Sequence, residues 1–233
     1  MADQVELEQK IGFSFHNPAY LELALIHSSY INENPCLAAE SNERLEFVGD
    51  AVLGLVIAER LYQDFPRSAE GELTRLRAAL VRRETLAQMA RKIDLGAYLS
   101  LGIGEEAGGG RDKSANLAGA FESLIAAIYL DQGLESARSF ILGLFGPEIY
   151  QQAYRAVGTD YKSKLQEIMQ AHSQITPTYF LMETVGPEHD KQFTVEVRAG
   201  EEALGRGTGK SKKLAEMEAA RSALEKYPRN KLQ

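Results

Sequence analysis

The sequence has few of the residues that identify cross-linked, zinc-binding or membrane-inserted proteins. Its single cysteine, Cys36, cannot form an internal disulfide, and without a nearby cluster of Cys or His it does not indicate a zinc site. No basic N-terminal region precedes a short apolar run, and the most apolar stretches, 51–58 and 117–130, are too short to span a membrane or contain a glutamate. We therefore expect a cytoplasmic protein with no membrane partner, in which Cys36 is an ordinary small side chain.

Tracts rich in proline or serine and internal repeats of fixed period are also missing. With 233 residues, 44% of them hydrophobic, the chain can bury one large core and a second, smaller one. Strand patterns are scarce up to residue 153, where periodicity predicts one helix after another. The predicted helices are 19–30, 42–64, 70–92, 114–131 and 134–153, with loops at 64–71 and 102–112.

The pattern changes after a short predicted linker at 154–159. A helix at 160–172 is followed by a strand from Pro177, a half-buried strand at 192–200 and a short strand at 202–208. In the second strand Phe193, Val195 and Val197 alternate with Thr194, Glu196 and Arg198. Ser211 is predicted to cap a last helix with apolar positions at Leu214, Met217, Ala220, Leu224 and Tyr227. The predicted fold class is an all-α domain at 1–153 followed by a small α+β domain at 160–233, in the order α-β-β-β-α.

Charge is divided unevenly between the two predicted domains. The whole chain carries −7, but residues 160–233 contain 12 Lys or Arg and 11 Asp or Glu, which leaves −8 for residues 1–159. Within the second domain Arg206, Lys210, Lys212 and Lys213 form a run without an intervening acid. Such a run is typical of a phosphate contact and equally of a solvated helix end, and charge alone leaves both interpretations open.

Acidic residues gather on one face of the predicted helix 42–64. Glu43, Glu46 and Asp50 fall within about 60° of one another around the helix axis, where like charges repel. The same face continues into Leu53 and Ile57, so it points toward protein interior or an interface. A second helix carries Glu122 as its only acid between Asp112 and Asp131, among residues typical of a core: Phe121, Leu124, Ile125 and Ile128.

An ionised carboxylate on an apolar face is costly unless a cation or a hydrogen-bond network meets it. Together Glu46, Asp50 and Glu122 offer hard oxygen ligands of the kind that Mg²⁺ or Mn²⁺ prefers. The alternatives are ordinary salt bridges, or stabilisation of first-turn acids by the helix dipole. The candidate salt-bridge partners are Arg44, Arg75 and Arg77.

Four segments in order resemble the ribonuclease III nuclease domain. They are 22-ELALIHSSYINEN-34, 43-ERLEFVGDAVL-53, 70-EGELTRLRAALV-81 and 122-ESLIAAIYLD-131. The second half resembles a double-stranded-RNA-binding domain through 163-SKLQE-167, 177-PTYFLMETVGPEH-189 and 205-GRGTGKSKKLAEMEAA-220. Two separate motif sets cover nearly the whole chain, in the order of the bacterial enzymes.

The resemblance implies a homodimeric endoribonuclease of rRNA and mRNA processing. Such enzymes hydrolyse phosphodiesters in both strands of double-stranded RNA, leaving 5′-phosphates and short 3′ overhangs. By position, Glu46, Asp50 and Glu122 match the metal-binding acids, with Mg²⁺ as cofactor, Mn²⁺ as a substitute and no small-molecule cofactor. Glu43 and Glu70 match acids beside the catalytic valley and dimer interface. His27 is interpreted as a packed structural residue. Phe47 and Val48 are candidates for the apolar face that a dimer covers.

One position departs from the family pattern. An Asp is usual three residues before the acid matched by Glu122, and here that residue is Gly119. Water can replace a missing carboxylate around Mg²⁺, and Asn116 is a candidate for supplying an oxygen. The alternative function is therefore a catalytically weakened or inactive protein that only binds double-stranded RNA.

The resemblance also implies how duplex RNA is held, through its shape, 2′-hydroxyls and phosphates. Gln166 and Glu167 would meet one minor groove and the loop around His189 the next, although Glu167 also reads as a plain surface acid. The start of the last helix would meet major-groove phosphates through Lys210, Lys212 and Lys213. The candidates for contacting the scissile region are Arg75, Arg77 and Lys113, with salt bridging as the alternative.

Overall fold

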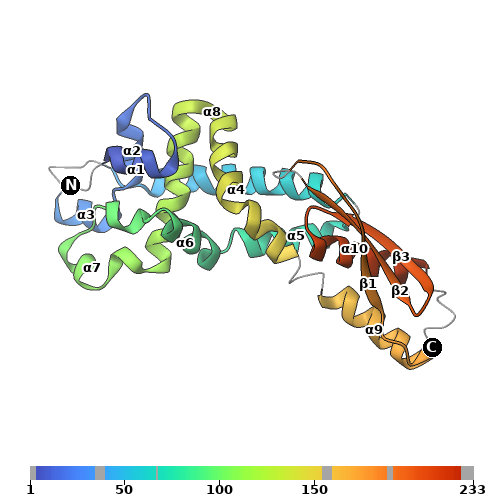
Figure 1. The fold of residues 1–233 in the computed structure, drawn as a ribbon. Coiled ribbons are helices and arrows are strands. Elements are labelled where there is room, and N and C mark those ends of the chain that lie inside the picture. Colours follow the sequence, from blue (N-terminus) through green and yellow to red (C-terminus); the bar gives the residue numbers. More distant parts are fainter. Residues whose placement is uncertain (1–3, 35–39, 67, 154–158, 188–190, 227–233) are drawn as a thin grey trace. The chain divides into compact units, whose positions relative to one another are not determined.

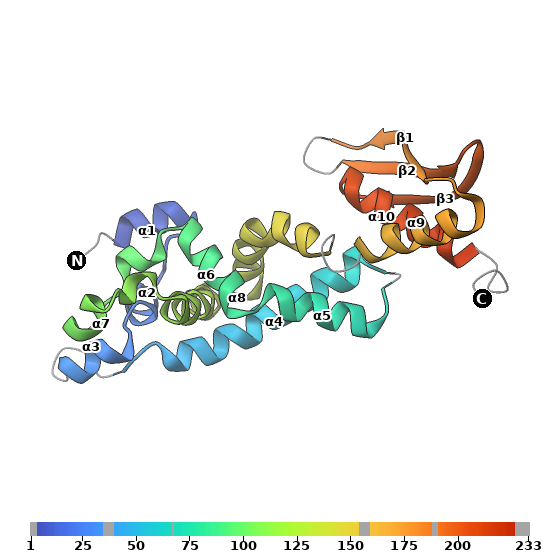
Figure 2. The ribbon, with the colours of Figure 1, turned by 90° about the horizontal axis from the view of Figure 1, so that it is seen from below.

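The computed structural model describes residues 4–34, 40–66, 68–153, 159–187 and 191–226. The chain divides into two compact units, Met1–Glu148 and Ile149–Gln233 (Figures 1 and 2). The first is helical, and the second contains a three-stranded sheet with helices before and after it. This confirms the predicted fold class. The predicted linker, Cys36 and Tyr227 lie wholly or largely outside the described residues.

Two long helices form the centre of the first unit, α4 (Glu43–Asp64) and α8 (Ser114–Ala153), the latter running past the boundary of the unit at Glu148. Both predicted helices at 114–131 and 134–153 belong to α8, which is interrupted at Gly133, where φ is 82°. Figures 1 and 2 show α4 crossing the first part of α8 steeply. The remaining elements are α1 (Gln4–Ile11), α2 (Pro18–Ala24), α3 (Ser28–Glu33), α5 (Glu70–Leu80), α6 (Arg83–Lys92), η1 (Leu95–Tyr98), α7 (Ile103–Ala107) and η2 (Gly110–Asp112).

The core of the first unit follows the apolar pattern of these two helices. In α4, Leu53, Val56 and Ile57 are fully buried, and in α8 Phe121 and Ile125 are too. Burying such side chains contributes roughly 1.5–3 kcal/mol each, which is why the two helices hold the unit together. No helix in the described part of the chain has the length and apolarity needed to cross a membrane.

The predicted helix 19–30 is wrong as one element, because α2 ends at Ala24 and α3 begins at Ser28. Between them Ile26 pairs with Ser100, and the His27 N–H donates to the Ser100 carbonyl at 3.1 Å. The His27 ring caps the new helix, with Nδ1 accepting the Ser29 N–H at 3.2 Å. A contact with a residue some 70 positions away therefore breaks the helix.

The predicted helix 70–92 is also two helices, α5 and α6. Arg82 is extended between them, with φ −70° and ψ 152°, and the Thr85 hydroxyl donates to the Ala79 carbonyl at 2.9 Å across the break. The predicted loop 102–112 contains α7 and η2, and α1 was not predicted at all. The start of α7 depends on Glu33, whose carboxylate accepts the N–H groups of Ile103 and Gly104 at 2.7 and 3.3 Å.

The second unit has the predicted α-β-β-β-α order. Its elements are α9 (Thr159–Ser173), β1 (Thr178–Val185), β2 (Gln192–Ala199), β3 (Glu202–Gly209) and α10 (Lys212–Lys226). The strands form an antiparallel sheet in the order β1-β2-β3. Val195 and Val197 point into a core with Leu165 and Met169. A Cβ at Gly207 would lie 2.2 Å from the Ala219 backbone nitrogen, so α10 packs directly on the backbone of β3.

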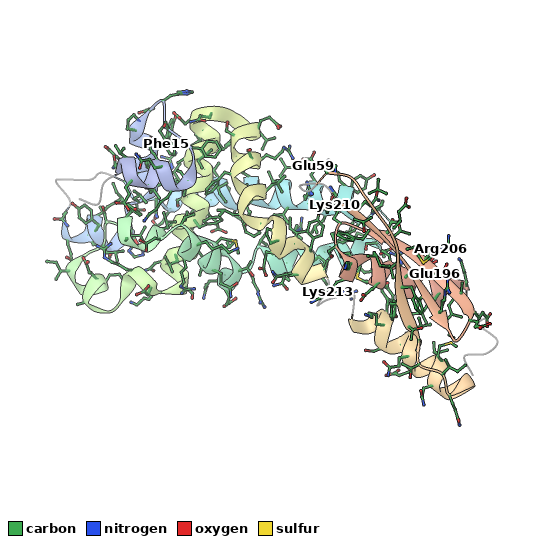
Figure 3. All side chains as sticks on the ribbon, viewed as in Figure 1. Phe15, Glu59, Glu196, Arg206, Lys210 and Lys213 are labelled. Carbon is green, nitrogen blue, oxygen red and sulfur yellow. The ribbon has the colours of Figure 1, made fainter. Side chains whose placement is uncertain are left out.

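The alternation predicted for β2 gives the correct side of the sheet but not the exposure of Glu196. Glu196 points away from the core, yet its side chain is only 2% exposed. Arg198 Nε donates to one of its carboxylate oxygens at 2.6 Å, and Arg206 from β3 donates to the other. Glu196 and Arg206 face each other across the strands (Figure 3). Two arginines therefore cover an acid that the pattern leaves in solvent.

Candidate functional site

The three acidic candidate-site residues of α4, Glu43, Glu46 and Asp50, lie in its first two turns. The helix begins where Asn42 is fixed by its N–H to the Ile26 carbonyl, at 2.8 Å, and by its side-chain amide to the Ala24 carbonyl, at 3.1 Å. Glu43 is exposed, and its carboxylate accepts the Ser41 hydroxyl at 2.9 Å. Glu46 is half-buried and Asp50 exposed. The positive end of the helix dipole favours acids in this first turn.

A close approach of two helices brings the fourth acid to this face. A Cβ at Gly49 would lie 1.8 Å from the Glu122 carbonyl oxygen, so only glycine lets the backbones of α4 and α8 touch here. Glu122 is thereby held beside the turns of α4 that carry Glu46 and Asp50. Residues far apart in the sequence thus share one surface, which we call the acidic face: Glu43, Glu46, Asp50 and Glu122.

The carboxylates of the acidic face influence one another electrostatically. Partial burial, followed by the charges of Glu46 and Asp50, raises the pKa of Glu122 from 4.5 to about 7. Burial is also the main cause that raises the pKa of Glu46, with further contributions from Glu43 and Asp50 and an opposing one from His27. Such perturbed carboxyl groups are typical of functional sites.

Salt bridges do not neutralise this face. Within the described part of the chain, no Lys or Arg forms an ion pair with Glu46, Asp50 or Glu122, and Arg44 pairs instead with Glu40 at 3.4 Å. Lys113, a candidate for an RNA contact, pairs with Glu105 at 2.8 Å. The salt-bridge alternative for the acidic face is therefore wrong for the described residues, among which Glu46, Asp50 and Glu122 have no cationic partner.

The donor set fits a hydrated hard cation better than a closed protein cage. Carboxylate oxygens are the ligands that Mg²⁺ and Mn²⁺ prefer. Among the residues that the structure describes, no three His, Cys, Asp or Glu side chains converge closely enough to enclose a metal ion by themselves. Mg²⁺ usually keeps several waters and takes one or two carboxylates directly, so one or two of Glu46, Asp50 and Glu122 would suffice as direct ligands.

Gly119 borders the acidic face, and its missing side chain matters to Glu46. A Cβ built at Gly119 would lie 2.6 Å from Glu46 Oε2, so the Glu46 carboxylate takes up room that a side chain at 119 would need. Asn116 is engaged elsewhere: its amide nitrogen donates to Glu105 Oε1 at 2.8 Å and to the Gly110 carbonyl at 2.9 Å. These two hydrogen bonds of Asn116 therefore hold Glu105 and Gly110 against the first turn of α8.

Glu70 does not join the acidic face. It is exposed at the start of α5, where its carboxylate accepts the Thr74 hydroxyl at 3.1 Å, and no contact in the described structure joins it to Glu46, Asp50 or Glu122. Its predicted place beside the catalytic valley stays a prediction.

An apolar stripe runs along α4 next to the acidic face. Phe47, Leu55 and Tyr62 are 80%, 54% and 73% exposed. Together with Ala51 and Ala58 they recur every three or four residues, which places them on one side of the helix. Val48, the other candidate for a dimer face, is half-buried. Exposed apolar surface of this extent on one helix indicates a partner.

The predicted RNA-contacting residues lie on the two helices of the second unit. Gln166 and Glu167 are exposed on α9, where they line an open groove with Ser163 and Gln170. Lys212 and Lys213 are the first two residues of α10, Lys210 lies two residues before the helix, and all three are exposed (Figure 3 labels Lys210 and Lys213). The Ser211 hydroxyl accepts the Leu214 N–H at 3.2 Å, which confirms the predicted cap. His189 lies outside the described residues.

Sequence reasoning missed one polar contact next to the acidic face. Ser123 follows Glu122 in α8, is fully buried, and places its hydroxyl within hydrogen-bond distance of the Asn42 and Gly119 carbonyls. The only signal in the sequence is a serine within an otherwise apolar stretch of helix.

The sequence matches two known domain families. Residues 17–148 match the Ribonuclease-III-like family, and residues 161–227 match the double-stranded RNA binding motif. The chain is 51% identical over 227 residues to a Ribonuclease 3 of Dehalococcoides mccartyi, covering 97% of this chain and 96% of the relative. It is 49% identical over 222 residues to a Ribonuclease 3 of Roseiflexus sp., covering 94% of each.

Solved structures resemble the helical unit. The nuclease domain of ribonuclease III from Campylobacter jejuni is 38% identical with a TM-score of 0.58, covering 64% of this chain and 97% of that one. A second structure of that domain, 39% identical with the same TM-score, covers 62% of this chain and 97% of its own. It is described as showing structural flexibility in a region involved in dimer formation.

Proposed function

The chain belongs to the ribonuclease III family and is an endoribonuclease of that type, and from this premise we propose a metal-dependent reaction at the acidic face. The substrate is double-stranded RNA, cut in both strands to leave 5′-phosphates and short 3′ overhangs. Mg²⁺ is the proposed cofactor, and Mn²⁺ substitutes for it. The observation that carries the proposal is a set of mutually repelling carboxylates without a cationic partner among the described residues.

Each acid has a role that follows from its position. Glu46 and Asp50, one turn apart on α4, and Glu122, facing them from α8, would hold and orient a hydrated cation. Such an ion would supply a more acidic water and charge neutralisation at the phosphate. Because the pKa of Glu122 is raised to about 7, this residue carries a proton in part of the molecules at neutral pH, which it would give up on binding a cation. No side-chain nucleophile is required.

The second unit supplies affinity for RNA. The double-stranded RNA binding motif covers residues 161–227 and thus all of α10, whose exposed N-terminal lysines suit phosphate oxygens. A helix N-terminus adds its own positive end to these charges. Gln166 and Glu167 on α9 are the proposed contacts to the 2′-hydroxyls of a minor groove. Because the second unit binds the RNA, the nuclease unit can carry a net negative charge.

We further propose that two copies pair through the apolar stripe of α4. The stripe lies beside the acids on the same helix, so covering it with a second copy brings the acidic faces of both copies to one interface. Phe47→Asp is expected to convert the dimer to a monomer, because it places a charge in the centre of an apolar contact. Sedimentation velocity checks this, and a Phe47→Asp protein that still sediments as a dimer contradicts it.

The proposed cellular role is rRNA and mRNA processing in the cytoplasm. This role follows from the family alone, and RNA sequencing of cells depleted of the protein tests it through accumulated precursors.

Gly119 raised the alternative of a protein that binds RNA without cutting it. Similarity to curated Ribonuclease 3 proteins over nearly the whole chain does not support that alternative. In the structure, the Glu46 carboxylate fills the space into which a side chain at position 119 would project, so an acid already lies at that point of the face. Three acids with water are sufficient ligands for Mg²⁺.

The deciding experiment is a cleavage time course on a long perfect RNA duplex with Mg²⁺, Mn²⁺ or a chelator. We expect cutting with either metal, none with chelator, and products with 5′-phosphates and short 3′ overhangs. The matched variant is Gly119→Asp. If the parent protein leaves the duplex intact and only Gly119→Asp cuts it, the proposed activity is wrong and the chain is a binder with one carboxylate too few.

A further inference from the structure

A buried hydroxyl links the two helices that carry the acidic face. Ser123 is 0% exposed, and its Oγ lies 3.0 Å from the Asn42 carbonyl oxygen and 2.8 Å from the Gly119 carbonyl oxygen. A serine in a helix often donates back to the carbonyl four residues earlier, here that of Gly119, and the single hydroxyl proton of Ser123 is shared between this carbonyl and that of Asn42. The contact with Asn42 is different in kind, because it joins α8 to the first residue before α4.

The Asn42 carbonyl is the acceptor on which Glu46 depends. It receives the backbone N–H of Glu46 at 2.9 Å, the first hydrogen bond of α4. Asn42 itself is fixed on its other side by the hydrogen bonds to Ile26 and Ala24. The Ser123 hydroxyl therefore touches the same peptide group that sets the position of the Glu46 backbone.

Two of the contacts between α4 and α8 lie on either side of Glu43 and Glu46. At one, Gly49 meets the Glu122 backbone, and at the other Ser123 meets Asn42. These α4 positions are seven residues apart, about 10 Å along the helix axis, and Glu43 and Glu46 lie between them. The buried side chains of the core hold the two helices together along their length. The Ser123 contact adds a polar link at the start of α4, close to the Glu46 backbone.

Gly119 makes this link more important in this chain. Gly119 has no side chain to offer α4, and the Glu46 carboxylate fills the space that one would occupy, so the polar contact from this turn of α8 to the Asn42 carbonyl is made by the Ser123 hydroxyl. Deletion of a hydroxyl in this position leaves the Asn42 carbonyl with the Glu46 N–H as its partner, so folding survives while the lateral fixation is lost.

We propose that Ser123 is a positioning residue of the acidic face, which fixes Glu46 relative to Glu122 for metal binding by holding the Asn42 carbonyl against α8. This inference rests on the proposed metal-dependent function. Groups that orient metal ligands without touching the metal typically change metal affinity about 10- to 100-fold when removed.

The test compares Ser123→Ala with a matched loss of another buried hydroxyl. Thr85 is 1% exposed and donates to the Ala79 carbonyl at 2.9 Å within the same unit, away from the acidic face, so Thr85→Val is the control. Mn²⁺ binding to each full-length protein is measured by calorimetric titration at pH 7.5. Cooperative melting without metal confirms that both variants fold.

We expect Ser123→Ala to bind Mn²⁺ about tenfold more weakly than the parent protein, and Thr85→Val to bind it with the parent's affinity. Equal affinity in Ser123→Ala and the parent overturns the inference while the metal site stands. Equal weakening in both variants overturns it too, because general loosening then explains the loss. If the parent binds no Mn²⁺, the proposed metal dependence fails and this inference fails with it.

Discussion

Two glutamates in this chain are both shielded from water, but the charged groups next to them have opposite signs. Glu122 in the helical unit is largely shielded from water, and its nearest charges are the acids Glu46 and Asp50, which raise its pKa to about 7. Glu196 in the RNA-binding unit is only 2% exposed, and the guanidinium groups of Arg206 and Arg198 lower its pKa. One acid lacks a cation from the chain and the other has two.

The difference distinguishes an acid that the fold itself neutralises from one that we propose binds a metal ion. A shielded carboxylate paired with arginines is satisfied by the fold itself, and the pair links β2 to β3. A shielded carboxylate among other carboxylates costs the fold free energy, and that cost persists only where it serves a purpose. Burial alone therefore does not identify a catalytic acid in this protein; the sign of the neighbouring charges does.

The largest expected effect comes from removing the charge of Glu122. Glu122→Gln keeps size and hydrogen bonding but removes one metal ligand, so we expect duplex cleavage in Mg²⁺ to slow by about a hundredfold to a thousandfold. Initial rates on a long perfect duplex measure it. The control is affinity for the same RNA in chelator, which stays unchanged. A variant that cuts at the parent's rate would remove Glu122 from the site.

A smaller effect is expected in the RNA-binding unit, where the chain supplies the cations. Lys212→Ala is expected to weaken binding to all duplexes about three- to tenfold and to lower the slope of log affinity against log salt by about one. The matched control is Lys226→Ala, which removes the same charge at the other end of α10. Fluorescence anisotropy in chelator over several salt concentrations measures both. Equal losses in the two variants, or a loss confined to one RNA sequence, contradict the assignment.

The pH dependence of stability tests the raised pKa of Glu122 without metal. Between its ordinary pKa of 4.5 and about 7 the folded chain binds this proton more tightly than the unfolded chain, so stability falls as pH rises through this range. Glu122→Gln removes that slope. In chelator at pH 8 the variant is expected to melt a few degrees above the parent, with no difference near pH 4. A variant that melts lower at pH 8 shows that the acid is not strained.

For Glu196 we expect a pH dependence of stability opposite in sign to that of Glu122, and the smallest change in stability. Because its pKa is lowered, the ionised form stabilises the fold above its ordinary pKa of 4.5, and this stability is lost as pH falls through the lower folded value. Glu196→Gln should therefore lower the melting temperature at pH 7, and the difference should shrink in acid. Calorimetric scans measure it, with the exposed Glu201→Gln as control. A difference that grows in acid reverses the assigned sign.

Local patterns predicted the elements whose apolar period is strong and whose ends are determined nearby. The helix 43–64, the three strands and the cap at Ser211 are of this kind. The breaks at Ile26 and Arg82 were missed because hydrogen bonds to Ser100 and across the Thr85 turn determine them, and neither break has a glycine or proline. The start of α7 was missed because Glu33, some 70 residues earlier, caps it.

The residues of the candidate site also divide into those that local sequence patterns identify and those whose placement depends on contacts with distant elements. The grouping of Glu43, Glu46 and Asp50 follows from helical spacing alone, and Glu122 stood out as a lone acid in an apolar helix. That Glu122 faces the other three depends on the Gly49 crossing, which no local pattern contains. The role of Ser123 and the burial of Glu196 likewise depend on partners from other elements.

The link between Ser123 and Asn42 spans 81 residues of the chain, which has a consequence for how the protein matures. A ribosome that has released α4 has made three of the acids but not the fourth, and the acidic face cannot assemble until α8 has emerged and packed. Closing so long a segment costs entropy that only the completed core repays. A nascent or truncated chain that ends before α8 therefore lacks Glu122 and cannot form the complete acidic face.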